Sequence, residues 1–189
     1  MPVRIAVPPI LLSVAAVAVA GLSACKSAPV DPTANLPLRP VESVRCGGKP
    51  PDALAPALGE VPPDERAPHN ASSIEVSRLS RVDREDGMQA IIELRIDSFD
   101  AKRAPAVFAG DLRVILKTER AEPCYLVFDV ALATKRQVQQ RTDPTLGQVV
   151  VRLEPFWDRA PGPGEAVDLT ATLTGLDGKV MESTLRLTW

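Results

Sequence analysis

Apolar and polar residues alternate with a period of two through much of the chain after residue 72. In the clearest stretch the apolar residues Ala90, Ile92, Leu94 and Ile96 are each separated by one residue. Side chains of a β-strand point alternately to its two faces, so this pattern is typical of a strand with one face in a core. The same alternation occurs in about seven short segments. They are 74–79, 90–96, 112–117, 124–132, 149–153, 167–173 and 181–189.

Turn signals separate these segments, and no helical stripe is sustained between them. Asp86-Gly87 and Asp177-Gly178 are hairpin-turn dipeptides. The one place where a helical turn is expected is 133–140, where Thr134 and Val138 share a face. We therefore predict an all-β fold, an antiparallel β-sandwich of about seven strands. The pattern resembles immunoglobulin-like, C2-like and fibronectin-like sandwiches in architecture, but it lacks the Cys…Trp…Cys spacing of true immunoglobulin domains.

The first 24 residues follow the pattern of a secretory leader. Arg4 is the only charged residue before Cys25, and 10–22 is a largely apolar stretch. This stretch is shorter than the roughly 20 residues that a membrane-spanning helix needs. We predict a leader over 1–24, with an uncleaved membrane helix, or cleavage near Ala20, as the alternatives.

The tetrapeptide Leu22-Ser23-Ala24-Cys25 resembles the lipobox of bacterial lipoproteins. This resemblance implies that the Cys25 thiol receives diacylglycerol, that cleavage occurs before it, and that the new amine is acylated. Two or three acyl chains anchor a protein durably, whereas one holds it only reversibly. Lys26 follows the cysteine, where an Asp would imply retention at the inner membrane in the best-known sorting system. We expect a lipid anchor in the cell envelope, with the outer membrane favoured over the inner.

Proline is dense between Lys26 and His69. Proline removes amide donors and fixes φ, so it interrupts helices and central strands. The sequence therefore predicts three parts: a leader at 1–24, the lipidated Cys25 with a Pro-rich tether at 25–72, and the sandwich domain at 73–189.

Three cysteines are present, and lipidation of Cys25 leaves Cys46 and Cys124. An exported protein meets an oxidising compartment, where paired cysteines usually bond. We predict a Cys46–Cys124 disulfide, with two free thiols as the alternative. It closes a loop of about 79 residues, which stabilises the fold by about 4.5 kcal/mol in the chain-entropy model.

No motif in the sequence forms a recognisable catalytic or metal site. The acids at 83–86 lack the spacing of a calcium loop, and Gly48-Lys49 is followed by Pro50 where a phosphate-binding loop needs Ser or Thr. His69 is the only histidine and lies in the Pro-rich segment, where orientation as a catalytic base is not expected. We interpret Lys135, Arg136 and Arg141 as a solvated basic loop. No metal, no cofactor and no enzymatic activity are expected.

Phe156 and Trp157 form an aromatic pair on the loop that follows segment 149–153. An aromatic pair on a loop is a candidate contact for a partner, because Trp is favoured in binding hot spots. The alternative is that Trp157 folds back and closes the end of the sandwich. Trp189 continues the alternation of Leu185 and Leu187, so we place it in the core.

The formal net charge is −2 and only 4% of residues are aromatic, which gives no reason to expect nucleic acid as a partner. We predict a membrane-anchored envelope lipoprotein that acts without catalysis, as a module that binds another envelope protein or as an accessory subunit. The alternatives are a module that binds carbohydrate or a small molecule and, more remotely, an enzyme.

Overall fold

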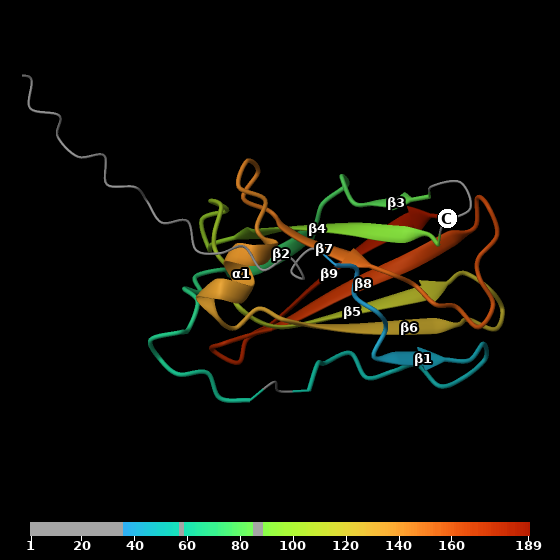
Figure 1. Ribbon diagram of the computed structural model, residues 1–189, viewed down its shortest axis with the longest axis horizontal. Helices are drawn as coiled ribbons and strands as arrows, with labels where there is room; N and C mark the ends of the chain where they lie inside the picture. Colours follow the sequence, from blue (N-terminus) through green and yellow to red (C-terminus); the bar gives the residue numbers. More distant parts are fainter. Residues whose placement is uncertain (1–35, 57–58, 85–88) are drawn as a thin grey trace, which may run out of the picture.

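The computed structural model describes residues 36–56, 59–84 and 89–189. These residues form two antiparallel sheets packed face to face with one short helix, as Figure 1 shows, so the predicted all-β sandwich is confirmed. The elements are β1 (Glu42–Val44), β2 (Ser73–Val76), β3 (Arg81–Asp83), β4 (Ile91–Phe99), β5 (Gly110–Thr118), β6 (Tyr125–Ala131), α1 (Lys135–Arg141), β7 (Val149–Leu153), β8 (Ala166–Gly175) and β9 (Val180–Thr188). The seven predicted segments correspond to the strands other than β1 and β3, which have three residues each and are too short to show an alternation.

The larger sheet has the strand order β1-β6-β5-β8-β9. In the smaller sheet β4 is central. Its Ile92 is paired with Val82 of β3 and also with Leu153 of β7, so β3 and β7 flank it on opposite sides. β2 pairs with the other half of β4, on the β3 side. The sandwich therefore has two lateral seams, one where β7 lies near β6 and one where β2 and β3 lie near β9.

The core lies between the sheets and is built from the inward residues of each alternation. Ile92, Leu94 and Ile96 of β4 have no exposed surface, and neither do Leu112, Leu116, Leu169 and Leu173 on the facing sheet. Burying each such side chain stabilises the fold by about 1.5–3 kcal/mol. The alternation seen in the sequence is thus the direct cause of the two-layer structure.

The described part of the Pro-rich segment, which was predicted to be a tether, bonds to the sandwich. Leu38 donates its amide to Arg152 O at 2.8 Å and accepts from Glu154 N at 2.8 Å, so it adds to the outer edge of β7. A few residues later β1 pairs with β6 of the other sheet. In Figure 1 the blue segment makes this crossing, and it closes the seam between β7 and β6.

The rest of the described Pro-rich segment also packs against the sandwich. Ala67 and Ala71 are buried in the core, and Ala67 N donates to Ala133 O at 2.9 Å. On the outer face of the larger sheet, Arg113 donates to Asp52 O at 3.0 Å. Proline prevents regular structure, but single hydrogen bonds from the residues between prolines still fix such a segment. The sequence pattern could not show this, because these contacts have no period.

The helix α1 confirms the predicted helical turn. Thr134 is its N-cap, and Thr134 and Gln137 form a reciprocal capping box. Val138 is its buried residue. Lys135, Arg136 and Arg141 therefore lie on a helix, which corrects their interpretation as a loop. Burial lowers the pKa of the Arg141 guanidinium from its ordinary value.

The leader at 1–24, the lipobox with Cys25, and the Asp86-Gly87 turn lie outside the described residues. Among the helices of the described ranges, none is long and apolar enough to cross a membrane.

Candidate aromatic binding site

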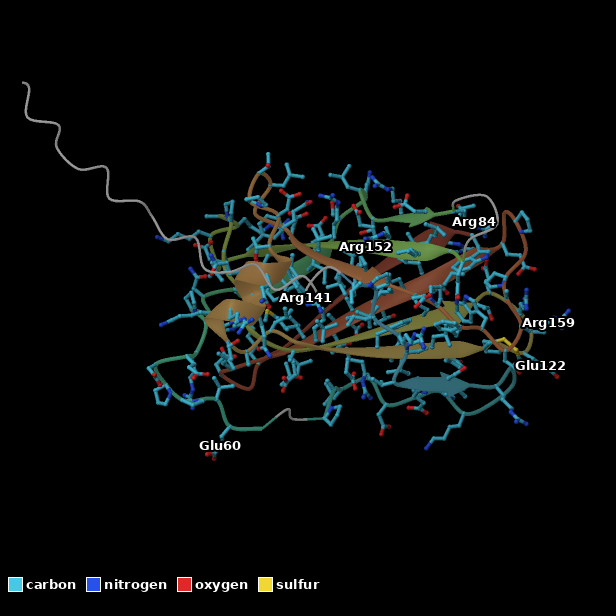
Figure 2. The ribbon with its side chains drawn as sticks, in the orientation of Figure 1. Glu60, Arg84, Glu122, Arg141, Arg152 and Arg159 are labelled. Atoms are coloured by element: carbon cyan, nitrogen blue, oxygen red, sulfur yellow. A yellow bond between two sulfur atoms is a disulfide. The ribbon has the colours of Figure 1, made fainter. Side chains whose placement is uncertain are left out.

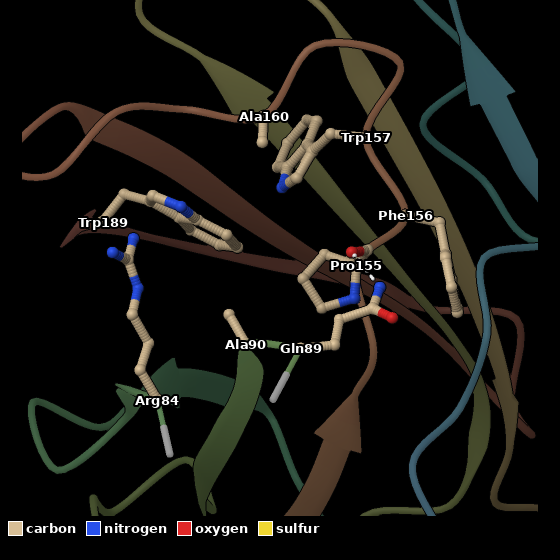
Figure 3. A pocket seen from close by; sticks show the side chains of 8 residues that line it. All are labelled: Arg84, Gln89, Ala90, Pro155, Phe156, Trp157, Ala160 and Trp189. Atoms are coloured by element: carbon tan, nitrogen blue, oxygen red, sulfur yellow. Dashed lines mark hydrogen bonds between the residues drawn. The ribbon is translucent and has the colours of Figure 1, made fainter. Parts of the chain in front are cut away.

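An apolar pocket lies at the end of the sandwich where β9 finishes. Its volume is about 400 Å³, which falls in the range of small-ligand sites. Figure 3 shows the pocket from close by. The lining residues are Arg84, Gln89, Ala90, Pro155, Phe156, Trp157, Ala160 and Trp189. The structure thus places the predicted contact residues Phe156 and Trp157 in the wall of one cavity.

Trp157 and Trp189 form the aromatic wall of this pocket. Their ring centroids lie 6.0 Å apart and the ring planes are inclined by 86°, an edge-to-face pair. The guanidinium of Arg84 lies 5.1 Å from the centroid of Trp189. Both tryptophans also pack against the hydrophobic core while remaining partly exposed. Trp157 therefore fits both interpretations. It packs against the core at the end of the sandwich, and it also presents part of its surface to the pocket.

The loop that carries the aromatic pair is held from the β5–β6 hairpin. Arg120 donates to the carbonyls of Arg159 and Ala160 at 3.3 and 3.0 Å, and it pairs with the carboxylate of Glu165. Glu165 also accepts from Gly162 N at 2.9 Å. The Gly162 amide and then the Arg120 guanidinium lower the pKa of Glu165 below its ordinary value. This network holds an irregular Pro- and Gly-rich loop in one conformation.

Two further contacts fix the start of the same loop. Gln89 donates its side-chain amide to Pro155 O at 2.9 Å, across the floor of the pocket, as the dashed line in Figure 3 marks. Arg39 lies 5.2 Å from the centroid of Phe156 and 3.5 Å from Glu154. Phe156 is itself 40% exposed. The N-terminal segment that closes the β7–β6 seam thus also supports Phe156.

The indole nitrogen of Trp157 is buried and has no hydrogen-bond partner among the residues that the structure describes. In Figure 3 it lies on the side of the ring that faces Trp189 and Pro155. A buried donor without an acceptor costs about 1–3 kcal/mol. Among the lining residues that the structure describes, the other side-chain polar groups are the donor-only guanidinium of Arg84, the amide of Gln89 and the indole N–H of Trp189, and none of these side chains is a carboxylate. The arrangement suits an apolar ligand that brings a hydrogen-bond acceptor.

The disulfide predicted between Cys46 and Cys124 is present in the structure. It joins Cys46, two residues after the end of β1, to Cys124, the residue that precedes β6. Gly47 beside it has a φ of 79°, a left-handed conformation that favours glycine. Figure 2 shows this disulfide as a yellow bond near Glu122, at the same end of the molecule as Arg84 of the pocket lining.

His69 is not a loosely held linker residue, which corrects its expected setting. Its side chain is 8% exposed, and Nδ1 accepts from Ala109 N at 3.0 Å. Nε2 lies 3.6 Å from Asp177 Oδ1 at the tip of the β8–β9 hairpin. Both ring nitrogens face the protein, so His69 packs the Pro-rich segment against the sandwich. Among the described residues, no three His, Cys, Asp or Glu side chains gather as metal ligands would.

Comparison with models of known protein families finds no match to the chain. Comparisons with curated proteins and with solved structures find none either.

Proposed function

We propose that the protein is a non-enzymatic binding module of the cell envelope, anchored through lipidated Cys25, and that it binds another protein through the aromatic pocket. The observation that carries this proposal is the wall formed by Trp157 and Trp189, with a buried indole N–H that has no acceptor within the described part of the chain. A carbonyl or carboxylate of a partner satisfies this donor after a small shift of the rings. Aromatic residues at the centre of an interface supply much of its binding energy.

The preference for a protein over a sugar follows from the lining. A sugar presents hydroxyl groups that donate as well as accept, so a sugar site usually offers both donors and acceptors. Among the described lining residues the side-chain donors are Arg84, Gln89, Trp157 and Trp189, and the Oε1 atom of Gln89 is the one side-chain acceptor. An apolar side chain next to a backbone carbonyl matches this set better. Carbohydrate or small-molecule binding is the second candidate, supported by the paired indoles.

The lipid anchor is the part of the proposal that rests on sequence alone. The Cys25→Ala variant is expected to leave the membrane fraction. If that variant stays in the membrane fraction, the lipoprotein interpretation is wrong, but the proposed role of the pocket is not affected.

The proposal is tested by cross-linked co-purification of the lipidated protein from detergent-solubilised envelope. Trp157→Ala is compared with the wild type and with Leu146→Ala, which removes a side chain that is 53% exposed and absent from the pocket lining. We expect one protein to be recovered with the wild type and with Leu146→Ala, and at least about tenfold less of it with Trp157→Ala, since hot-spot truncation costs 2 kcal/mol or more.

Intrinsic fluorescence separates the two candidates. The chain has two tryptophans, and both line the pocket, so their emission reports on this site alone. Quenching by the purified partner but not by envelope polysaccharide supports the proposal. Equal recovery of the partner with Trp157→Ala contradicts it, and quenching by polysaccharide alone establishes the carbohydrate alternative.

A further inference from the structure

A second cavity lies between β3 and β9, on the seam opposite the one that the N-terminal segment closes. Its volume is about 520 Å³. The lining residues are Arg78, Ser80, Arg81, Val82, Leu185, Arg186, Leu187 and Thr188. They come from the edge of each sheet, so the cavity is a groove between two strand edges that do not pair with each other.

Within the described chain, the C-terminal half of β9 has backbone groups along this groove that do not pair with another strand. Trp189 N donates to Glu165 O at 2.7 Å and Trp189 O accepts from Gly164 N at 2.7 Å, so Trp189 bonds toward the β8 side. The β8–β9 register is unbroken, and in an antiparallel pair the direction alternates with each residue. The N–H and C=O groups of Arg186 and Thr188 therefore point away from β8. Among the described residues, no backbone hydrogen bond joins these groups to another segment.

β2 does not occupy this part of the edge. Its contact with β9 lies nearer the start of the strand, where Val76 N donates to Ser183 Oγ at 2.9 Å. β3 begins beyond the bend at Ser77–Ser80 and pairs with β4, not with β9. The open stretch of β9 thus starts near Leu185 and reaches the end of the strand.

The groove and the aromatic pocket are lined by residues that are close together in sequence. On β9, Thr188 lines the groove and the next residue, Trp189, lines the pocket. On the other side Val82 lines the groove, and Arg84 lines the pocket two residues later. Strands rise about 3.3 Å per residue, so the stretch from Leu185 to Trp189 accommodates about five residues of an extended segment.

The charge of the groove is positive at the end away from the pocket. Arg186 pairs with Glu119, and Arg81 lies 2.8 Å from Asp83 and 3.6 Å from Glu93. Arg78 has no carboxylate partner within the described ranges. An incoming segment with a carboxylate at this end is therefore attracted, and one with a cation is repelled.

We infer that the partner binds as an added β-strand: an extended segment of another protein pairs with Arg186 and Thr188 of β9, places an apolar side chain in the aromatic pocket, and carries a carboxylate near Arg78. This inference rests on the proposed function and specifies the form of its partner. Strand addition obtains affinity from main-chain hydrogen bonds and specificity from pockets for alternate side chains. Here the open edge of β9 supplies the main-chain hydrogen bonds, and the pocket with the Trp157–Trp189 wall supplies the specificity.

The test uses a displayed library of random linear peptides of about ten residues, which is long enough to span the groove and pocket at strand rise. The selected peptides are measured against wild type, Thr188→Pro and Thr188→Val. Proline removes the outward N–H of an exposed edge residue without removing a bond to β8, and valine keeps that N–H. We expect Thr188→Pro to weaken binding about tenfold, the equivalent of one lost interaction of about 1.4 kcal/mol, and Thr188→Val to bind as the wild type does.

Charge reversal is the second readout. Arg78→Glu is expected to weaken the same peptides, with a smaller effect at high salt, whereas Lys102→Glu at the far end of β4 changes nothing. Failure to select any linear peptide, or equal binding to Thr188→Pro, overturns strand addition. Partner capture that depends on Trp157 but not on Thr188 leaves the proposed function standing and rejects this inference alone. Self-association of the wild type that Thr188→Pro abolishes assigns the edge to a second copy of this chain and also rejects it.

Discussion

The two lateral seams of this sandwich are built in opposite ways. At the β7–β6 seam, residues 38–46 pair first with one sheet and then with the other, and a disulfide fixes their end. At the β3–β9 seam the strands stay apart, and the outward backbone groups of Arg186 and Thr188 have no partner in the described chain. Exposed strand edges invite pairing with other chains, and proteins usually cover them.

The contrast shows that the chain covers the exposed strand edges at one seam, β7–β6, and leaves those at the other seam, β3–β9, uncovered within the described residues. The N-terminal part of the Pro-rich segment, which has little regular structure of its own, closes the β7–β6 seam. The opposite seam is left with a groove, close in sequence to a pocket lined by both tryptophans. We interpret the closed seam as the support of the domain and the open seam as its binding face.

The largest effect is expected from opening the closed seam. The Cys46→Ala/Cys124→Ala variant should lose about 3–4 kcal/mol of unfolding free energy, because the unfolded chain is no longer constrained by a loop of about 79 residues. Urea denaturation followed by tryptophan fluorescence measures this change. A loss below about 1 kcal/mol would mean that the seam is held without the disulfide.

The next effect concerns the ion pair that pins the Pro-rich segment to the larger sheet. Arg113 and Asp129 are cross-strand neighbours, their side chains are each 10% exposed, and their closest atoms lie 2.7 Å apart. Arg113→Met should destabilise the protein by about 2–3 kcal/mol, since it leaves the carboxylate of Asp129 buried and unpaired.

The matched control for this pair is the double variant Arg113→Met/Asp129→Leu, which removes both charges. It should recover most of the stability in the same denaturation experiment. If the double variant is no more stable than the single one, the cost comes from the lost bond to Asp52 O and not from the unpaired charge.

A smaller effect is expected at the loop that supports the pocket. Arg120→Ala should lower stability by about 1 kcal/mol, because this side chain is mostly buried while Glu165 is partly exposed. It should also shift the emission of Trp157, which is best resolved in a Trp189→Phe background. Arg120→Lys keeps the charge but not the forked geometry, so it should restore the signal only in part. Unchanged emission in Arg120→Ala would mean that the loop is positioned by Pro155 and Gln89 instead.

The smallest effect is a pH dependence of the same loop. The pKa of Glu165 is lowered in the folded protein from its ordinary value of 4.5 by the Gly162 amide and by Arg120. Its stabilising contribution is therefore complete above pH 4.5 and is lost as the pH falls through the lowered pKa. Tryptophan emission should be constant from neutral pH down to pH 4.5 and should change as the pH falls further. The Glu165→Gln variant should not show this change. Acid sensitivity that persists in Glu165→Gln would assign it to another carboxylate, such as Asp143 or Asp177, whose pKa values are also lowered.

The two-sheet fold was predictable because each long strand buries one face, and that leaves a period of two in the sequence. The disulfide was predictable because assigning Cys25 to the predicted lipobox leaves two cysteines, Cys46 and Cys124. The packing of Leu38, Ala67 and His69 was not, because irregular backbone is held by isolated hydrogen bonds that leave no pattern. Phe156 and Trp157 were identified by residue type, whereas Arg84 and Gln89 carry no local signal and join the pocket only through the fold. The open edge of β9 depends on which strands lie beside it, which a single sequence does not state.

The central claim, that one seam is closed and the other open, is tested most directly by residue-resolved amide hydrogen exchange of the free protein. The account predicts fast exchange at Arg186 and Thr188, and slow exchange at Leu187 and Trp189, which bond toward β8. It also predicts slow exchange at Val41, which precedes β1 at the closed seam and donates to Val127 O of β6 at 2.8 Å. Equal protection of Arg186, Leu187 and Thr188 in the free protein would show that the β9 edge is already covered and would contradict the account.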